Sequence, residues 1–145
     1  MNDKLINDTD LQLDANHLNI LASKKIFFGH QSVGLNIIDG ISQLKALNPG
    51  LNIEIKATKY PDSESGPAFM HSVVGENQQP LLKIQDFEKI VGSTTNPKLD
   101  IAMLKFCYLD VDKTTDVDHL FSEYESAVYR LLKAHPDTIF VHFTV

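Results

Sequence analysis

Apolar positions along the chain follow two spacings, one typical of buried strands and one typical of amphipathic helices. Short apolar runs predict four strands, over residues 26–29, 51–57, 99–106 and 138–145. Apolar residues at helical spacing predict helices over about 33–47, 80–91 and 116–134. This alternation predicts a doubly wound, three-layer α/β domain with a mostly parallel sheet in the strand order 2-1-3-4, and a switch point between the first and third strands.

Capping and turn-forming residues mark where these elements begin and end. Asp14 can cap a short helix before the first strand, and Thr115 or Asp116 can cap the last helix. Gly92 is expected to end the helix that starts at Pro80. The chain therefore divides into a lead-in over residues 1–24 and one α/β domain over residues 25–145.

A long segment without sustained periodicity separates the second predicted strand from the helix at Pro80. It runs from Thr58 to Gln79 and contains two prolines and two glycines. Loops of this length in a compact domain are commonly functional. We therefore expect a functional loop over residues 58–79.

Composition limits the classes of partner. The chain has 145 residues, is 43% hydrophobic and carries a formal net charge of −6 with interspersed signs, which suits one globular domain and gives no basic surface for nucleic acid or membrane. Cys107 is the single cysteine, so an internal disulfide and a multi-cysteine metal site are excluded. The compartment stays open, because a signal for export can have been removed before Met1.

The last predicted strand is apolar and has no helix after it in the sequence. A strand of this composition is a pairing hazard when its edge is uncovered. Two explanations remain open: the chain is a fragment of a longer protein, or the terminal strand pairs with a partner in a homo-oligomer.

The turn after the first strand is the strongest candidate for a functional site. An apolar run leads through His30, Gln31 and Ser32 directly into a predicted helix. In an open α/β sheet this turn lies at the carboxyl edge, where ligands bind. Ser32 can serve there as a nucleophile or simply as the N-cap of the helix, and His30 can carry protons or donate to an oxyanion.

Segment 28–34, Phe-Gly-His-Gln-Ser-Val-Gly, resembles a variant of the first block of SGNH (GDSL-type) hydrolases, in which a serine nucleophile follows the first strand. The resemblance implies that Gly75 and Asn77, with the Ser32 amide, stabilise the oxyanion. Ser32 is preferred over Gln31 as the nucleophile because it supplies a hydroxyl. The fold implied is flavodoxin-like or SGNH-like, but a flavodoxin-like signalling domain would need acidic residues after the first strand, which are absent.

Further site residues are expected at the ends of strands and in the long loop. The predicted substrate-binding residues are Gln31, His71, Glu76, Lys105, Tyr108 and Asp110. Asp62, Glu64 and His71 have irregular spacing, so no metal site and no cofactor are predicted. Cys107 is interpreted as a small buried residue, and His142 as a packed or edge residue of the last strand, rather than as site residues.

The resemblance implies hydrolysis of an ester, including acetyl esters of carbohydrates. The family places its Asp-x-x-His base after a fifth strand, so we expect the chain to be inactive or weakly active as it stands. One Asp-x-x-His occurs at 116–119, and acidic residues that complement the dipole in the first turn of a helix are the preferred explanation for it. The alternative function is a non-catalytic module that binds a small polar ligand or carbohydrate.

Overall fold

The computed structural model describes residues 14–95 and 98–143. Its five strands form one parallel sheet in the order β2-β3-β1-β4-β5. The strands are β1 (Lys25–His30), β2 (Ile55–Ala57), β3 (Ala68–Val73), β4 (Ile101–Leu104) and β5 (Ile139–His142). The helices are α1 (Ala15–Ala22), α2 (Gly34–Leu47), α3 (Pro80–Ser93) and α4 (Val117–Ala134). This is the three-layer α/β fold that the apolar pattern predicts.

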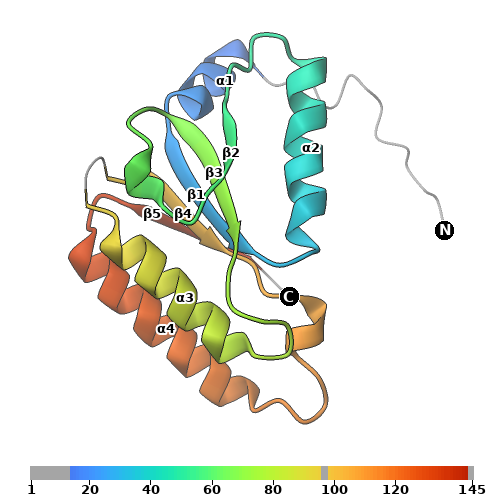
Figure 1. The fold of residues 1–145 in the computed structure, drawn as a ribbon, viewed down its shortest axis with the longest axis vertical. Helices are drawn as coiled ribbons and strands as arrows, with labels where there is room; N and C mark the ends of the chain where they lie inside the picture. Colours follow the sequence, from blue (N-terminus) through green and yellow to red (C-terminus); the bar gives the residue numbers. More distant parts are fainter. Residues whose placement is uncertain (1–13, 96–97, 144–145) are drawn as a thin grey trace, which may run out of the picture.

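The helices cover the two faces of the sheet in pairs, with α1 and α2 on one face and α3 and α4 on the other (Figure 1). Alternate residues of β1 divide between the two layers: Phe28 packs in the cluster with Ile38 of α2, and Phe27 packs with Phe87 of α3. All six residues of β1 are buried. A strand buried on both faces reads as a continuous apolar run, which is why the sequence identifies β1 so clearly.

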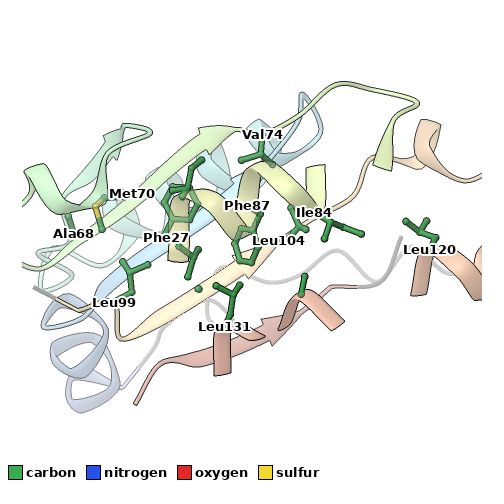
Figure 2. Close-up of a cluster of buried hydrophobic side chains, with 14 residues drawn as sticks. Phe27, Ala68, Met70, Val74, Ile84, Phe87, Leu99, Leu104, Leu120 and Leu131 are labelled. Atoms are coloured by element: carbon green, nitrogen blue, oxygen red, sulfur yellow. The ribbon is translucent and has the colours of Figure 1, made fainter. Parts of the chain in front are cut away.

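The larger core cluster lies between the sheet and the pair α3 and α4 (Figure 2). Phe27, Met70 and Leu104 project from three different strands, and the Phe27 and Phe87 rings are stacked with centroids 6.2 Å apart. Phe27 and Met70 have no solvent exposure. β1, β3 and β4 are therefore supported by closely packed side chains on the face of the sheet that α3 and α4 cover.

The predicted loop over residues 58–79 is wrong, because it contains β3, an interior strand of the sheet. β3 pairs with β1 on one side and with β2 on the other. Ala68, Phe69 and Met70 are all buried, so the segment lacks the polar alternation that marks a half-exposed strand. Pro67 before it and Gly75 after it are typical turn residues, and they predict turns at both ends of the segment.

The predicted strand order 2-1-3-4 corresponds to β2-β1-β4-β5 in the labels of the structure, and β3 corrects it. β3 separates β2 from β1, whereas β1, β4 and β5 are neighbours as predicted. Gly92 does not end its helix, since α3 continues to Ser93. The side chains of Asp14 and Asp116 cap α1 and α4 by accepting from the amides of Asn16 and His119.

Several strands are shorter than predicted. Of the predicted ranges 51–57 and 99–106, only Ile55–Ala57 and Ile101–Leu104 pair as strands, although Leu51 and Leu99 are buried. β5 ends at His142, and residues 144–145 lie outside the described residues.

Replacing Leu104 with alanine is expected to destabilise the fold by about 2–5 kcal/mol, because the side chain fills the core between the sheet and α3. The matched control is Leu35→Ala on α2, where the leucine is 47% exposed and the expected loss is below about 1 kcal/mol. Urea unfolding followed by circular dichroism measures both, and equal losses would contradict this assignment of the core.

Candidate functional site

The carboxyl edge of the sheet is where the chain reverses the side on which its helices pack. After β1 the chain enters α2 on one face, whereas after β3 and β4, the two neighbours of β1, it enters α3 and α4 on the other face. In open α/β sheets ligands bind at such a reversal, outside the carboxyl ends of the strands. Ligand-binding residues are therefore expected directly after β1, β3 and β4.

Two histidines meet at this edge. His30 ends β1 and is fully buried, whereas His71 lies in β3 and is half-buried. His30 Nε2 lies 3.0 Å from His71 Nδ1, and the two rings are stacked with centroids 5.2 Å apart. The phenyl ring of Phe28 also stacks with the His30 ring, with centroids 5.0 Å apart. The pair is thus held on the face of the sheet that α2 covers.

The hydrogen bonds determine which ring nitrogens carry protons. His30 Nδ1 lies 2.7 Å from the carbonyl oxygen of Gln31, which can only accept, so Nδ1 donates. In the neutral ring His30 Nε2 is then an acceptor, and His71 Nδ1 donates to it. This leaves the lone pair on His71 Nε2, which has no partner among the described residues and is open to solvent. The arrangement orients His71 as a proton acceptor.

The environment favours the neutral form of both histidines. Desolvation lowers the pKa of His30 below its ordinary value, and the backbone bond to Gln31 opposes this only in part. Desolvation also lowers the pKa of His71, and the neighbouring charge of a protonated His30 would lower it further. A neutral imidazole with an outward lone pair is the form that removes a proton.

Glycine at position 34 is required by the closeness of α2 to His30. A Cβ on Gly34 would lie 2.3 Å from the His30 Cβ and 2.4 Å from its Cγ. Real carbon atoms do not approach this closely, and the His30 ring is enclosed on its other faces. The first turn of α2 therefore packs directly against the buried imidazole.

Gln31 joins the turn after β1 to the loop after β3. Its side-chain nitrogen donates to the carbonyl oxygens of Val74 and Gly75, at 2.7 and 2.8 Å. The amide of Val74 in turn donates to the carbonyl of His30 at 3.0 Å. Gln31 thus acts as a structural bridge here, and its amide nitrogen is already occupied.

Ser32 is exposed in the turn between β1 and α2. The helix begins at Gly34 with Val33 as its N-cap, and no side chain caps it, so the interpretation of Ser32 as a helix cap is wrong. Its hydroxyl forms no hydrogen bond within the described part of the chain. Ser32 therefore presents a free hydroxyl at the carboxyl edge, two residues after His30.

A buried ion pair organises the loops after β3 and β4. Lys83 on α3 and Asp110 both have fully buried side chains, and the ammonium lies 2.6 and 2.7 Å from the two carboxylate oxygens. Asp110 also accepts from the amides of Gln78 and Cys107 at 3.0 and 2.7 Å. Every oxygen of this carboxylate is used inside the protein, so Asp110 supports the site rather than contacting a ligand.

The residues expected to form the oxyanion pocket differ in what they offer. The Gly75 amide donates to Asp86 at 3.0 Å and is therefore occupied. The side-chain oxygen of Asn77 accepts from Lys83 at 3.0 Å, which leaves the Asn77 amide nitrogen as a free, exposed donor. Gly75 has a φ of +54°, and a Cβ there would lie 2.6 Å from the Lys83 amide, so only glycine fits this turn.

The remaining predicted site residues lie along the same edge without converging on one point. Lys105 follows β4, and its amide donates to the carbonyl of Gly29, which places it beside the end of β1. Tyr108 is 68% exposed in the 3₁₀ turn Tyr108–Asp110. Glu76 is exposed and accepts from Gln79 at 2.9 Å.

Other chemistry-bearing residues lie elsewhere. His119 and Asp116 line a groove of about 460 Å³ at the start of α4, and a second groove of about 910 Å³ runs beside α4; neither is lined by Ser32 or His71. Among residues 14–95 and 98–143 no three side chains gather as metal ligands. Cys107 is buried, as expected.

Sequence reasoning missed Lys83 and the contact between the two histidines. Lys83 falls in phase with Ile84, Phe87 and Ile90 on the buried side of α3, whereas Leu81 and Leu82 are more than a third exposed. A lysine in phase with an apolar stripe signals a buried partner. The histidine contact has no such signal, because the sequence pattern predicts a loop around His71.

Comparisons with protein-family models, with curated proteins and with solved structures each returned no match. None of the helices in the described part of the chain combines the length and the apolar character needed to span a membrane.

Replacing Lys83 with methionine is expected to lower the free energy of unfolding by about 3–5 kcal/mol, because Asp110 then remains as a buried, unpaired charge. Adding Asp110→Asn should recover part of this loss by removing the charge. The control is Lys98→Met, whose pair with Asp137 at 3.0 Å is exposed, so about 1 kcal/mol or less is expected. Urea titration measures all three variants, and a Lys83 effect no larger than the control would contradict the role of the pair.

The histidine pair should make stability depend on pH. Because the folded protein lowers both histidine pKa values, the unfolded chain binds protons first, and stability falls as the pH drops through the ordinary value of 6.5 and below. His71→Gln removes one of the two groups and should flatten this dependence between about pH 7.5 and 5. The control is His17→Gln, where the side chain is 72% exposed. The measurement is the urea midpoint of unfolding at several pH values in this range. A pH dependence in His71→Gln equal to that of the unmodified chain would overturn the prediction.

Proposed function

We propose that this chain is an SGNH-like serine hydrolase domain that acts on carboxylic esters, with Ser32 as the nucleophile. The observation that carries the proposal is the unpartnered, exposed hydroxyl of Ser32 at the carboxyl edge, close in the chain to a histidine pair that ends in a free lone pair. The resemblance of segment 28–34 to the first block of that family supports the same assignment.

In this reaction the Ser32 oxygen bonds to the acyl carbon while its proton passes to a base, and the ester bond to the alcohol then breaks. The alcohol leaves with that proton, and water hydrolyses the acyl-enzyme. The developing oxyanion would be held by the Ser32 amide and by the Asn77 amide nitrogen, which Lys83 orients through the Asn77 oxygen. Lys105 follows β4 beside the end of β1 and is the residue proposed to lie near a polar group of the substrate.

Two sources of the base are compatible with this proposal. His71 Nε2 is the acceptor that the described residues themselves supply, with His30 as its positioning residue. The resemblance implies instead an Asp-x-x-His pair after a fifth strand, and β5 is the fifth strand along the chain. Activity of the given chain on its own is expected only in the first case.

A second candidate function is a non-catalytic module that binds a small polar ligand, including a carbohydrate. The internal use of the Gly75 amide and of the Gln31 amide favours it, because fewer donors then remain for an oxyanion. The exposed amide of Asn77 and the edge residue Lys105 would supply binding groups in this case.

A fluorophosphonate probe tests the proposal directly, since it phosphonylates activated serines with loss of fluoride. Mass spectrometry should find the label on Ser32, absent in Ser32→Ala and retained in Ser42→Ala, where the serine hydroxyl donates to Ile38 within α2. If His71 is the base, His71→Gln should slow labelling by about 100-fold or more.

The outcomes separate the two functions. Labelling only in a form extended through the natural C-terminus assigns the base to a later segment. No labelling in any folded form overturns the hydrolase proposal and leaves the binding module.

A further inference from the structure

The contact between His30 and His71 has a limited capacity for protons. In the neutral pair each ring carries its proton on Nδ1: His30 Nδ1 donates to the Gln31 carbonyl at 2.7 Å, and His71 Nδ1 donates to His30 Nε2 at 3.0 Å. Two lone pairs remain, one on His30 Nε2 inside the contact and one on His71 Nε2 at its outer end. The consequence of adding a proton therefore depends on which lone pair takes it.

A first proton fits the contact without any rearrangement. On His71 Nε2 it leaves the bond from His71 Nδ1 to His30 Nε2 in place, and that bond then joins a charged donor to a neutral acceptor. Hydrogen bonds from a charged donor are shorter and stronger than neutral ones. We expect the contact to tighten when His71 alone is protonated.

A second proton is incompatible with the contact. It has to bind His30 Nε2, where its N–H would point at the N–H of His71 Nδ1, with 3.0 Å between the two nitrogens. Neither ring then has a lone pair left to accept, and both carry a positive charge. Desolvation lowers the pKa of His71, and the charge of a protonated His30 lowers it further. The two rings must separate before both can be charged.

The surroundings of the two rings determine which of them leaves. His30 is fully buried, bonded to the Gln31 carbonyl, and so close to α2 that a Cβ on Gly34 would lie 2.6 Å from its Nδ1. His71 is half-buried, and within the described part of the chain the one ring stacked on it is that of His30. Rotation of the His71 side chain towards solvent separates the imidazoles while β3 stays paired in the sheet.

The charges around the pair do not compensate a second proton. Towards the carboxyl edge, the elements packed around the pair carry these charged side chains: Lys105 after β4, Asp39 on α2, Lys56 in β2 and Lys59 after it. Lys105 is itself a cation beside the end of β1, and Asp39 is exposed. Lys56 and Lys59 are paired with other carboxylates, and no described carboxylate raises the pKa of either histidine.

From this geometry we infer that the histidine pair is a two-step proton switch: it holds one proton without rearranging, and a second proton releases His71 from His30. The switch is a conformational property of the fold. In the proposed hydrolase with His71 as the base, the first proton would stop the reaction with the site intact, and the second would also take the base out of position. Only this last consequence rests on the proposed function.

Nitrogen-15 NMR of the histidine rings tests the inference on the labelled 145-residue chain, as the pH is lowered from about 8 to about 4. At high pH we expect both rings to carry their proton on Nδ1. On acidification His71 should become charged first, while the proton contacts between the two rings persist. His30 should become charged in a later step that abolishes these contacts, with the circular dichroism spectrum of the folded chain retained.

Replacing either histidine with phenylalanine keeps an aromatic ring and removes the hydrogen bond. In His30→Phe, His71 should lose its preference for a proton on Nδ1 and titrate in one step, nearer to the ordinary value of 6.5. In His71→Phe, His30 should become charged at a higher pH than in the unmodified chain, because no charge on residue 71 opposes it. The control is His119→Phe, an exposed histidine of α4, which should leave both steps unchanged.

Four results would overturn the inference. They are a proton on Nε2 of His71 in the neutral pair, a charge on His30 before His71, ring contacts that persist when both are charged, and loss of the whole fold before or together with the second proton. None of these results depends on whether Ser32 reacts with the fluorophosphonate probe. Failure of the switch and failure of the hydrolase proposal are therefore distinguishable.

Discussion

The buried pair of Lys83 and Asp110 is the contact on which the carboxyl edge of the sheet depends. Both side chains are fully buried, and the carboxylate also receives two backbone amides from different loops. One ion pair thus joins the start of α3, the turn before it and the segment after β4. Isolated buried charges are costly, so the arrangement persists only because every oxygen and the ammonium have partners.

The candidate site combines buried support with exposed reactive groups. His30 has no solvent exposure and both of its ring nitrogens are engaged, so its influence reaches a ligand only through His71. Ser32 has the opposite character, with an exposed hydroxyl and no internal partner. A backbone carbonyl, two imidazoles and an outward lone pair form a series in which each group orients the next.

The apolar pattern was sufficient for the layers of the fold and insufficient for its strand order. β1 and α4 have long, uniform patterns, and the structure confirms them closely. β3 has six residues, as β1 has, but its apolar run ends at Met70 and is followed by His71 and Ser72, and Pro67 precedes it. Neither periodicity nor composition therefore separates it from a loop. The turn at Ser32 was correctly placed at the carboxyl edge because that position follows from β1 alone. The meeting of His30 with His71 depends on the pairing of β1 with β3, which a sequence pattern does not encode.

The hydrogen bonds of Gln31 order the carboxyl edge of the sheet in the absence of a ligand. Its side chain holds the carbonyls of Val74 and Gly75, and the Val74 amide holds the carbonyl of His30. Hydrogen bonds therefore join the turn after β1 to the loop after β3 without a ligand. A molecule that docks here meets a surface already ordered, and little conformational entropy remains to be lost. A ligand that binds at this edge would therefore be selected by its fit to a preformed surface, without closure of the two loops around it.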